Sequence, residues 1–375
     1  EQDGHGRGHA EVGAGPAQLV EVDGQRLPLL VGAARNRDLE VIEDTDPRTM
    51  SRSVSAETAD TLTDMMVSVV ESGSGTGAQL PGVDVAGKTI IPGLIDGHAH
   101  GAAGDDDLIP QQNWVATAHL AFGVTTTHDP SNTSSEVFPM GELQRAGLIL
   151  APRTFSSGEI VYGARAPGRY ALVDSYEDAL AHVRRLEAQG AHSIKNYNQP
   201  RRDQRQQVAA AARAENILVV PEGGSLFSMD ITLIQDGNST LEHNIPQARL
   251  YEDVLSLWSQ TQVAYNPTLV VTYGGLAGDP YWVQATQVWN HPLLTRHAPP
   301  DALADRIRTE TAPPDQFVDQ VSAREAHRLA QRGVPVTIGA HGQQDGIAAH
   351  WEMWSFVKGG WTPLQALRAA TVNPA

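Results

Sequence analysis

The sequence predicts an α/β fold in which parallel strands and helices alternate around a barrel. From about residue 90 onward, short β-branched runs that end in polar residues alternate with helical stretches. Such alternation is typical of parallel pairing. Three successive strand ends fall at Lys195, Glu222 and His243, spaced 27 and 21 residues apart. A barrel of eight strand–helix units uses roughly 30 residues per unit, so this spacing favours a barrel.

The individual elements follow one another in the order that this fold requires. A helix is expected over 175–190, where Gly190 is placed to end it. Another is expected over 362–373, where Pro363 is placed at its first turn. Further helices are predicted at 204–216, 254–262 and 322–333, and strands at 121–130, 191–198, 217–224, 239–246, 263–270 and 334–342.

The N-terminal part has a different character. Residues 1–15 are polar and glycine-rich and indicate a tail, whereas 18–43 contain short apolar stretches that suit short strands. Residues 44–80 are rich in Ser, Thr and Gly and give no clear secondary structure, apart from a stretch that suits a short helix.

Composition excludes several kinds of partner and site. The net charge of −17 disfavours nucleic acid and anionic membranes, which need Lys and Arg. The apolar runs are too short for a membrane span. Without cysteine the chain has no disulfides and no thiolate metal site. Any metal must be held by its 14 histidines, by carboxylates or by a modified lysine, and the compartment stays open between cytoplasmic and extracytoplasmic.

Two histidines end the first predicted strand, in the stretch GLIDGHAHG over 93–101. On a strand, residues two positions apart point to the same face, so His98 and His100 can chelate one metal ion. The alternative is that both lie in a polar loop and bind nothing.

Four more ligand-type residues stand at later strand ends. A buried lysine is costly unless it is paired or modified, so Lys195 is either carbamylated, forming a carboxylate that bridges two cations, or ion-paired. Glu222 suits a metal ligand or a general base, or caps a loop. His243 suits a zinc ligand, although a lone histidine is more often structural. His341, with Asp345 nearby, suits a ligand or proton carrier, or a loop histidine bonded to backbone.

Seven stretches together resemble the amidohydrolase superfamily, over about residues 85–375 and in the family's order. The similarity is to an imidazolonepropionase-like and prolidase-like group that is often fused to a Tol-type β-propeller. The stretches are KTIIPGLIDGHAHG, GVTTTHDPSN, SIKNYNQPRRDQRQQ, VVPEGGSLF, TLEHNIP, NPTLVVTYGG and IGAHGQQDGIAAHWEMW. The resemblance implies a distorted TIM (β/α)8 barrel that carries one or two divalent metal ions, commonly zinc, and a small β-sandwich built from flanking segments.

The resemblance assigns metal-ligand roles to several of these residues. His98 and His100 match the metal pair of the first strand, and His243 matches the histidine of the sixth. Lys195 matches the lysine of the fourth strand, which is carbamylated in many members.

Two positions depart from the commoner family pattern. Glu222 stands where the fifth strand usually carries a histidine ligand. His341 stands where the eighth strand usually carries an aspartate that serves as ligand and proton carrier. The resemblance therefore implies His341 as general base, with Asp345 or Glu222 as the next candidates, and it leaves the number of ions open. His128 and Asp129 also end a predicted strand.

The expected activity is hydrolysis of a C–N bond other than an ordinary peptide bond, in an amide, cyclic amide or dipeptide, by metal-activated hydroxide. One alternative is a mononuclear deaminase or cyclic-amide hydrolase of the same fold, with Lys195 unmodified. Another is a binding module with a vestigial site. Loop residues expected to meet the small-molecule substrate are Tyr197, Asn198, Arg201, Arg202 and Tyr273.

The resemblance also implies a domain organisation. Residues 1–84 are expected to form the tail and part of the sandwich, and 85–375 the barrel. The C-terminal sandwich segment of the family is not found before Ala375, so the chain is expected to lack it. Expected partners are a β-propeller domain or a second copy of the chain.

Overall fold

The computed structural model describes residues 18–22, 25–29, 33–35, 41–44, 91–106, 108–164, 171–224, 226–308 and 311–375. The chain divides into two compact units, one comprising Glu1–Pro92 with Ala121–Gly123 and the other the remainder. The second unit contains every predicted site residue. The domain boundary predicted at residue 84 lies outside the described residues.

The first unit contains two antiparallel strand pairs. Strand β1 (Gln18–Val22) pairs with β2 (Gln25–Leu29), and β3 (Ala33–Arg35) pairs with β4 (Val41–Asp44). The short strands predicted over 18–43 are therefore confirmed. A β-sandwich built from them stays a prediction.

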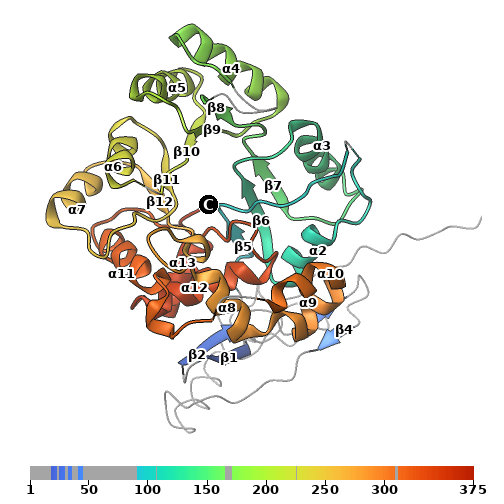
Figure 1. Ribbon diagram of the computed structural model, residues 1–375. Coiled ribbons are helices and arrows are strands. Elements are labelled where there is room, and N and C mark those ends of the chain that lie inside the picture. The colour runs from blue at the N-terminus through green and yellow to red at the C-terminus, as the bar shows by residue number, and fades with distance from the viewer. Residues whose placement is uncertain are drawn as a thin grey trace, which may run out of the picture. The chain divides into compact units, whose positions relative to one another are not determined.

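The second unit alternates strands and helices, and its strand ladders are all parallel (Figure 1). The parallel α/β class predicted from the sequence is confirmed. In chain order the elements are β5 (Leu94–Asp96), α2 (Trp114–Ala121), β6 (Val124–Asp129), α3 (Ser134–Arg145), β7 (Arg153–Ser156), β8 (Val161–Tyr162), α4 (Tyr176–Gln189), β9 (Ser193–Tyr197), α5 (Arg202–Ala214), β10 (Leu218–Pro221), α6 (Phe227–Gln235), β11 (Thr240–Glu242), α7 (Glu252–Ser259) and β12 (Ala264–Asn266).

The remaining secondary-structure elements of this unit are helices. It contains the short 3-10 turns η2 (Leu269–Val271), η3 (Val288–Asn290), η4 (Asp305–Ile307) and η5 (Pro314–Gln316), and the helices α8 (Gly278–Thr286), α9 (Pro292–His297), α10 (Pro300–Ala304), α11 (Asp319–Ala330), α12 (Ile347–Lys358) and α13 (Pro363–Ala369). Helices α11 and α13 confirm the helices predicted at 322–333 and 362–373.

The strands form three separate parallel sheets rather than one closed barrel. Their orders are β5-β6-β7, β8-β9-β10 and β11-β12. An isolated bridge between Glu222 and Glu242 connects the ends of β10 and β11. The described residues therefore show a succession of parallel strands, but not the closed barrel that the sequence predicts.

The strand predicted over 334–342 is seen only as a single parallel bridge between Tyr265 and Val336. Around this bridge the backbone bonds to β12, because the Tyr265 N–H donates to the Pro335 carbonyl at 2.8 Å and the Thr337 N–H donates to the Tyr265 carbonyl at 2.9 Å. Beyond the bridge the backbone of this segment has other partners. The Ile338 N–H donates to the Ala369 carbonyl of α13, and the His341 N–H donates to the His98 carbonyl at 2.6 Å. The segment still runs beside the end of β5, so His341 reaches the neighbourhood of His98.

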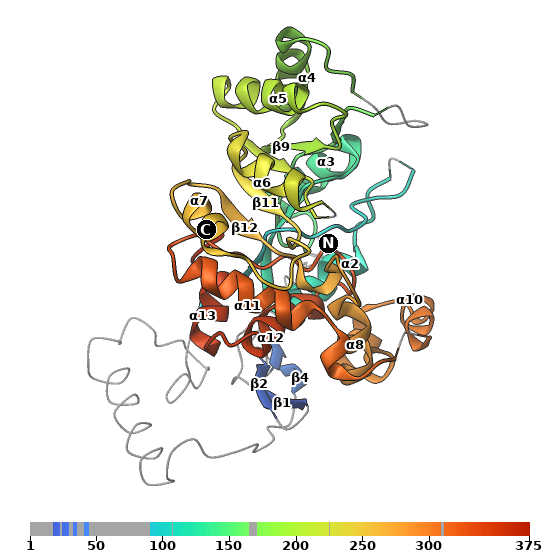
Figure 2. The same cartoon turned by 60° about the vertical axis from the view of Figure 1, so that its left-hand side comes forward.

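The helix predicted over 175–190 shows how local sequence sets an element. Ser175 and Asp178 form a reciprocal capping box at the start of α4, and Gly190 ends it in the left-handed region with φ 108°. The buried side of α4 presents Val183 and Leu186 to an apolar cluster shared with β9 and α5. Figure 2 shows α4 and α5 side by side above β9. Each fully buried side chain of this size contributes roughly 1.5–3 kcal/mol.

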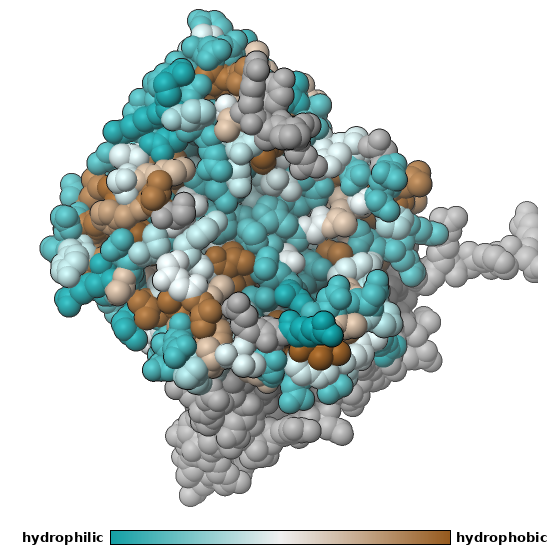
Figure 3. Space-filling model, in the orientation of Figure 1, coloured by the Kyte–Doolittle hydropathy of each residue, from teal (hydrophilic) through white to brown (hydrophobic). Residues whose placement is uncertain are grey.

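The visible face of the molecule is largely hydrophilic, with separate apolar patches (Figure 3). Among the described residues, no helix combines the length and the apolar character that crossing a bilayer requires.

Candidate metal centre

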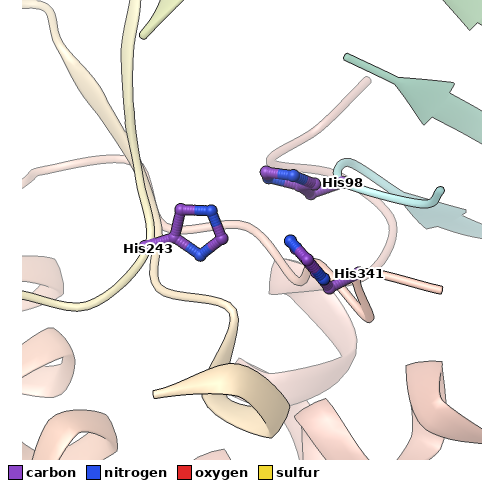
Figure 4. Close-up of side chains that lie close together, drawn as sticks. All are labelled: His98, His243 and His341. Atoms are coloured by element: carbon purple, nitrogen blue, oxygen red, sulfur yellow. The ribbon is translucent and has the colours of Figure 1, made fainter. Parts of the chain in front are cut away.

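Three histidines from distant parts of the chain converge in the second unit. His98 follows β5, His243 follows β11, and His341 lies in the loop before α12. One ligand nitrogen from each ring lies within 4.8 Å of the others. Their ring centroids are 4.9–5.1 Å apart, and Figure 4 shows the three rings around one common point. Three of the predicted ligands are therefore brought together.

Asp96 joins the two loops that carry His98 and His341. One carboxylate oxygen of Asp96 accepts the N–H of His98 at 3.2 Å and that of Ala340 at 3.0 Å. Gly339 must lack a side chain, because a Cβ there would lie 2.7 Å from the Cβ of His98. The motif GLIDGHAHG thus supplies both a ligand and the group that positions the opposite loop.

The backbone at two of these histidines is held in the left-handed region. His243 has φ 69° and His341 has φ 59°. Non-glycine residues rarely adopt this conformation, which costs on the order of 1–3 kcal/mol and clusters at functional sites. The surrounding hydrogen bonds therefore hold the backbone at both histidines in a conformation that it would rarely adopt by itself.

His100 lies beside the three-histidine group. Its Nε2 is 3.1 Å from the Nε2 of His98, and its ring centroid is 4.8 Å from that of His341. The prediction that His98 and His100 present their rings to the same side agrees with this geometry.

Lys195 and Glu222 form the remaining side of the cluster. Lys195 lies within β9 and is 1% exposed, and its Nζ is 2.7 Å from one oxygen of Glu222. The other Glu222 oxygen is 3.1 Å from Nε2 of His243. Burial alone would raise the pKa of Glu222, but the charge of Lys195 and the hydrogen bond from His243 hold it well below its usual range. Glu222 is therefore an anion beside the three rings.

Each of the four imidazoles is anchored through its Nδ1 by a side-chain oxygen. The acceptors or partners are Glu242 for His98 at 2.6 Å, Asp129 for His100 at 2.9 Å, Thr268 for His243 at 2.7 Å and Gln343 for His341 at 3.1 Å. Such partners fix ring orientation and turn Nε2, the candidate ligand atom, toward the cluster. Sequence reasoning singled out Asp129 only as a strand-end residue, and it assigned no role to Glu242, Thr268 or Gln343.

The protonation states suit metal binding. Burial lowers the pKa of His98 well below its ordinary value, with a contribution from the charge of Lys195. Burial also lowers the pKa of His243 and brings that of His341 to about 3. All three rings are therefore neutral at neutral pH, and neutral imidazole is the form that coordinates a metal. The donor set thus fits a divalent ion such as Zn²⁺.

Several other predicted site residues have different partners. Asp345 is buried and lies 3.6 Å from Nε2 of His119 in α2. Arg201 pairs with the exposed Asp203. Arg202, the first residue of α5, contacts Asp236, which directly follows the end of α6.

Asn198 is exposed, whereas both predicted tyrosines lie next to the cluster. The Tyr197 ring centroid is 5.9 Å from Nζ of Lys195. The Tyr273 ring centroid is 5.5 Å from that of His243.

Several solved structures have a similar arrangement of elements. The chain superposes on a putative prolidase from Bifidobacterium longum with a TM-score of 0.52 and 22% identity, over 75% of this chain and 68% of that one. The chain superposes on a Xaa-Pro dipeptidase with bound methionine with a TM-score of 0.53 and 16% identity, over 75% of this chain and 73% of that one. It superposes on molinate hydrolase with a TM-score of 0.55 and 14% identity, over 96% of this chain and 83% of that one.

The chain shares its fold with these structures, which are amidohydrolase-superfamily enzymes. This agrees with the resemblance seen in its sequence motifs. No curated protein shows significant sequence similarity to it.

The N-terminal segment matches a different family. Residues 19–91 match the family described as "Penicillin binding protein transpeptidase domain". The nucleophile of such enzymes stands in an S-x-x-K motif. The only lysine in this segment is Lys88, and Val85 stands three positions before it. The match therefore supplies no nucleophile, and it ends at Ile91, next to the boundary between the two units.

Proposed function

We propose that this chain is a metal-dependent hydrolase that cleaves a C–N bond in a small amide, cyclic amide or dipeptide. The observation that carries the proposal is the convergence of His98, His243 and His341, each with its Nδ1 anchored. The amidohydrolase fold supports it, because all these residues follow strands or lie in the loop that precedes α12. Fold alone does not establish an activity, so the proposal rests on the site.

The three histidines would hold the metal ion, with His100 and Glu222 available as further ligands. When bound, a divalent ion supplies a Lewis acid that makes water nucleophilic at neutral pH and polarises a carbonyl. Lys195 would either carry a carbamate that joins the ligand set or remain the ammonium partner of Glu222.

Proton transfer needs a group that is unprotonated at neutral pH and borders the cluster. His341 meets these conditions, but its Nε2 is required as a ligand atom. Asp345 is paired with His119. We therefore assign the role to Glu222, whose ionised carboxylate would accept the proton of the attacking water and return it to the leaving nitrogen.

Metal content and turnover together test this proposal. The full chain, reconstituted with Zn²⁺, should retain metal and hydrolyse members of a panel of dipeptides, N-acyl amino acids and lactams. His243→Ala should weaken metal affinity by about 10–100-fold or more and abolish turnover, because it removes a ligand. The matched control is His182→Ala in α4, a half-buried ring that bonds the Leu172 carbonyl outside the cluster. Equal metal content in both variants, with no turnover by the parent chain, would contradict the proposal.

A mononuclear deaminase or cyclic-amide hydrolase is the second candidate. The ion pair between Lys195 and Glu222 favours it, because an unmodified lysine cannot bridge two ions. A metal content near one ion per chain, and a mass that shows no carbamate on Lys195, would select this candidate over a dinuclear hydrolase.

A further inference from the structure

Tyr273 is held beside the metal centre by a buried amide. Its backbone N–H donates to Oδ1 of Asn244 at 2.6 Å, and its carbonyl accepts from Nδ2 of the same side chain at 3.1 Å. Asn244 is 1% exposed and directly follows His243. It also donates to the Ser322 hydroxyl at 3.0 Å. The residue after a ligand therefore fixes the position of Tyr273.

The ring of Tyr273 is fixed on two sides. It packs edge-on against His243, with centroids 5.5 Å apart and an interplanar angle of 86°. It also lies over the backbone of Gly224, where a Cβ would come within 2.3 Å of the tyrosine ring and φ is 118°. Tyr273 is nevertheless 36% exposed, so a molecule bound at the centre can reach the ring.

The phenol of Tyr273 carries no charge, and exposed apolar side chains follow in the loop that the ring covers. Burial raises the pKa of Tyr273, with a contribution from the charge of Glu222, so the phenol stays neutral. The loop that contains Gly224 continues to Leu226 and Phe227, which are 61% and 38% exposed. An aromatic ring that is fixed on two sides and accessible on the others is suited to pack against another apolar group.

We infer that Tyr273 is a specificity-determining residue that packs against an aromatic or branched apolar group next to the scissile bond, and that Asn244 is its positioning residue. This inference rests on the proposed function of the same site, because it names the class of substrate. The substrate is thus an amide with a bulky apolar substituent near the cleaved bond.

The test compares two N-acyl amino acids that differ only in side chain, N-acetylglycine and N-acetylphenylalanine, with the metal-loaded full chain. Tyr273→Ala should lower kcat/KM for N-acetylphenylalanine by about tenfold, mainly through KM, and that for N-acetylglycine by less than about threefold. Tyr273→Phe keeps the ring and should preserve the preference. Asn244→Ala should shift the preference in the same direction as Tyr273→Ala, with unchanged metal content.

The matched control is Tyr176→Ala at the start of α4, where the tyrosine is 37% exposed. It should leave both rates unchanged. If Tyr273→Ala lowers both rates equally, or neither, the inference is wrong although the hydrolase proposal stands.

Binding separates the inference from the proposed function. If the parent chain hydrolyses neither compound, calorimetric titration should still show tighter binding of N-acetylphenylalanine than of N-acetylglycine, with the difference lost in Tyr273→Ala. That outcome would refute the hydrolase proposal for these amides, but it would support the role of Tyr273 in binding an apolar group. Absence of any binding preference in the parent chain would overturn the inference.

Discussion

At the scale of single residues, orientation of the imidazoles depends on partners far away in the sequence. Glu242 is 1% exposed and accepts from Nδ1 of His98 at 2.6 Å, across a separation of 144 residues. Asp129 plays the same part for His100 at 2.9 Å. A carboxylate behind a ligating histidine fixes the tautomer and raises the basicity of the ring nitrogen that faces the metal.

Glu242→Gln should therefore weaken metal binding without removing a ligand. The amide can still accept a hydrogen bond from His98, but it lacks the carboxylate charge, so we expect Zn²⁺ affinity to fall by about tenfold. Competition with a chromophoric chelator measures this affinity. Glu142→Gln, which replaces an exposed carboxylate paired with Arg145, is the control. Unchanged affinity in Glu242→Gln would show that this carboxyl does not support the centre.

Sequence reasoning identified the residues of the cluster but not the groups that anchor them, for a physical reason. His98, Lys195, Glu222 and His243 were identifiable because parallel α/β folds place their chemistry at strand ends. Thr268 and Gln343 carry no comparable local signal. Their role follows only from contacts between strands and loops that the chain order does not reveal.

At the scale of elements, local signals predicted α4 well and failed for residues 334–342. The helix is set by its own Ser175 cap and by Gly190, which are visible in the sequence. The apolar run at 334–342 has the composition of a strand, yet it pairs with β12 only at one bridge, and beyond that bridge its backbone bonds to α13 and to the His98 carbonyl. Whether an apolar run forms a strand depends on neighbours far along the chain.

Helix α12 is connected to the loop after β12 by a buried carboxyl group. Glu352 is 0% exposed, and one of its oxygens accepts the Val270 N–H at 2.7 Å. Burial raises its pKa from 4.5 to about 8. The folded state therefore keeps a proton that the unfolded state loses. The stability from this group is complete below pH 4.5 and disappears as the pH rises through about 8.

Glu352→Gln should remove this pH dependence, because the amide is neutral throughout and can still accept the Val270 N–H. Between about pH 6 and about pH 9, the free energy of unfolding of the parent chain should fall by on the order of 2–3 kcal/mol more than that of the variant. Urea unfolding at both pH values measures the difference. Glu252→Gln is the control, since the hydrogen bond from Arg332 lowers the pKa of this exposed carboxyl. Parallel pH profiles for the parent and Glu352→Gln would contradict the assignment.

At the scale of the whole molecule, the histidine cluster joins the first and last parts of the second unit. His98 follows the first strand of that unit, and His341 precedes helix α12. The His341 N–H donates a hydrogen bond to the His98 carbonyl at 2.6 Å. The alternation of strands and helices predicted this proximity. It could not predict where the ladders break, because ladder continuity depends on the register between distant strands.

An ion bound by segments so far apart should stabilise the whole second unit. A ligand at 100 times its dissociation constant stabilises the folded state by about 2.7 kcal/mol, and in a chain of this size we expect a rise in Tm on the order of 5 °C. Differential scanning calorimetry of the chelator-treated chain, before and after addition of Zn²⁺, measures the shift. The shift should disappear in His98→Ala and persist in His182→Ala, which alters a half-buried ring on α4 outside the cluster. A shift of equal size in His98→Ala would place the stabilising ion elsewhere and exclude these histidines as its ligands.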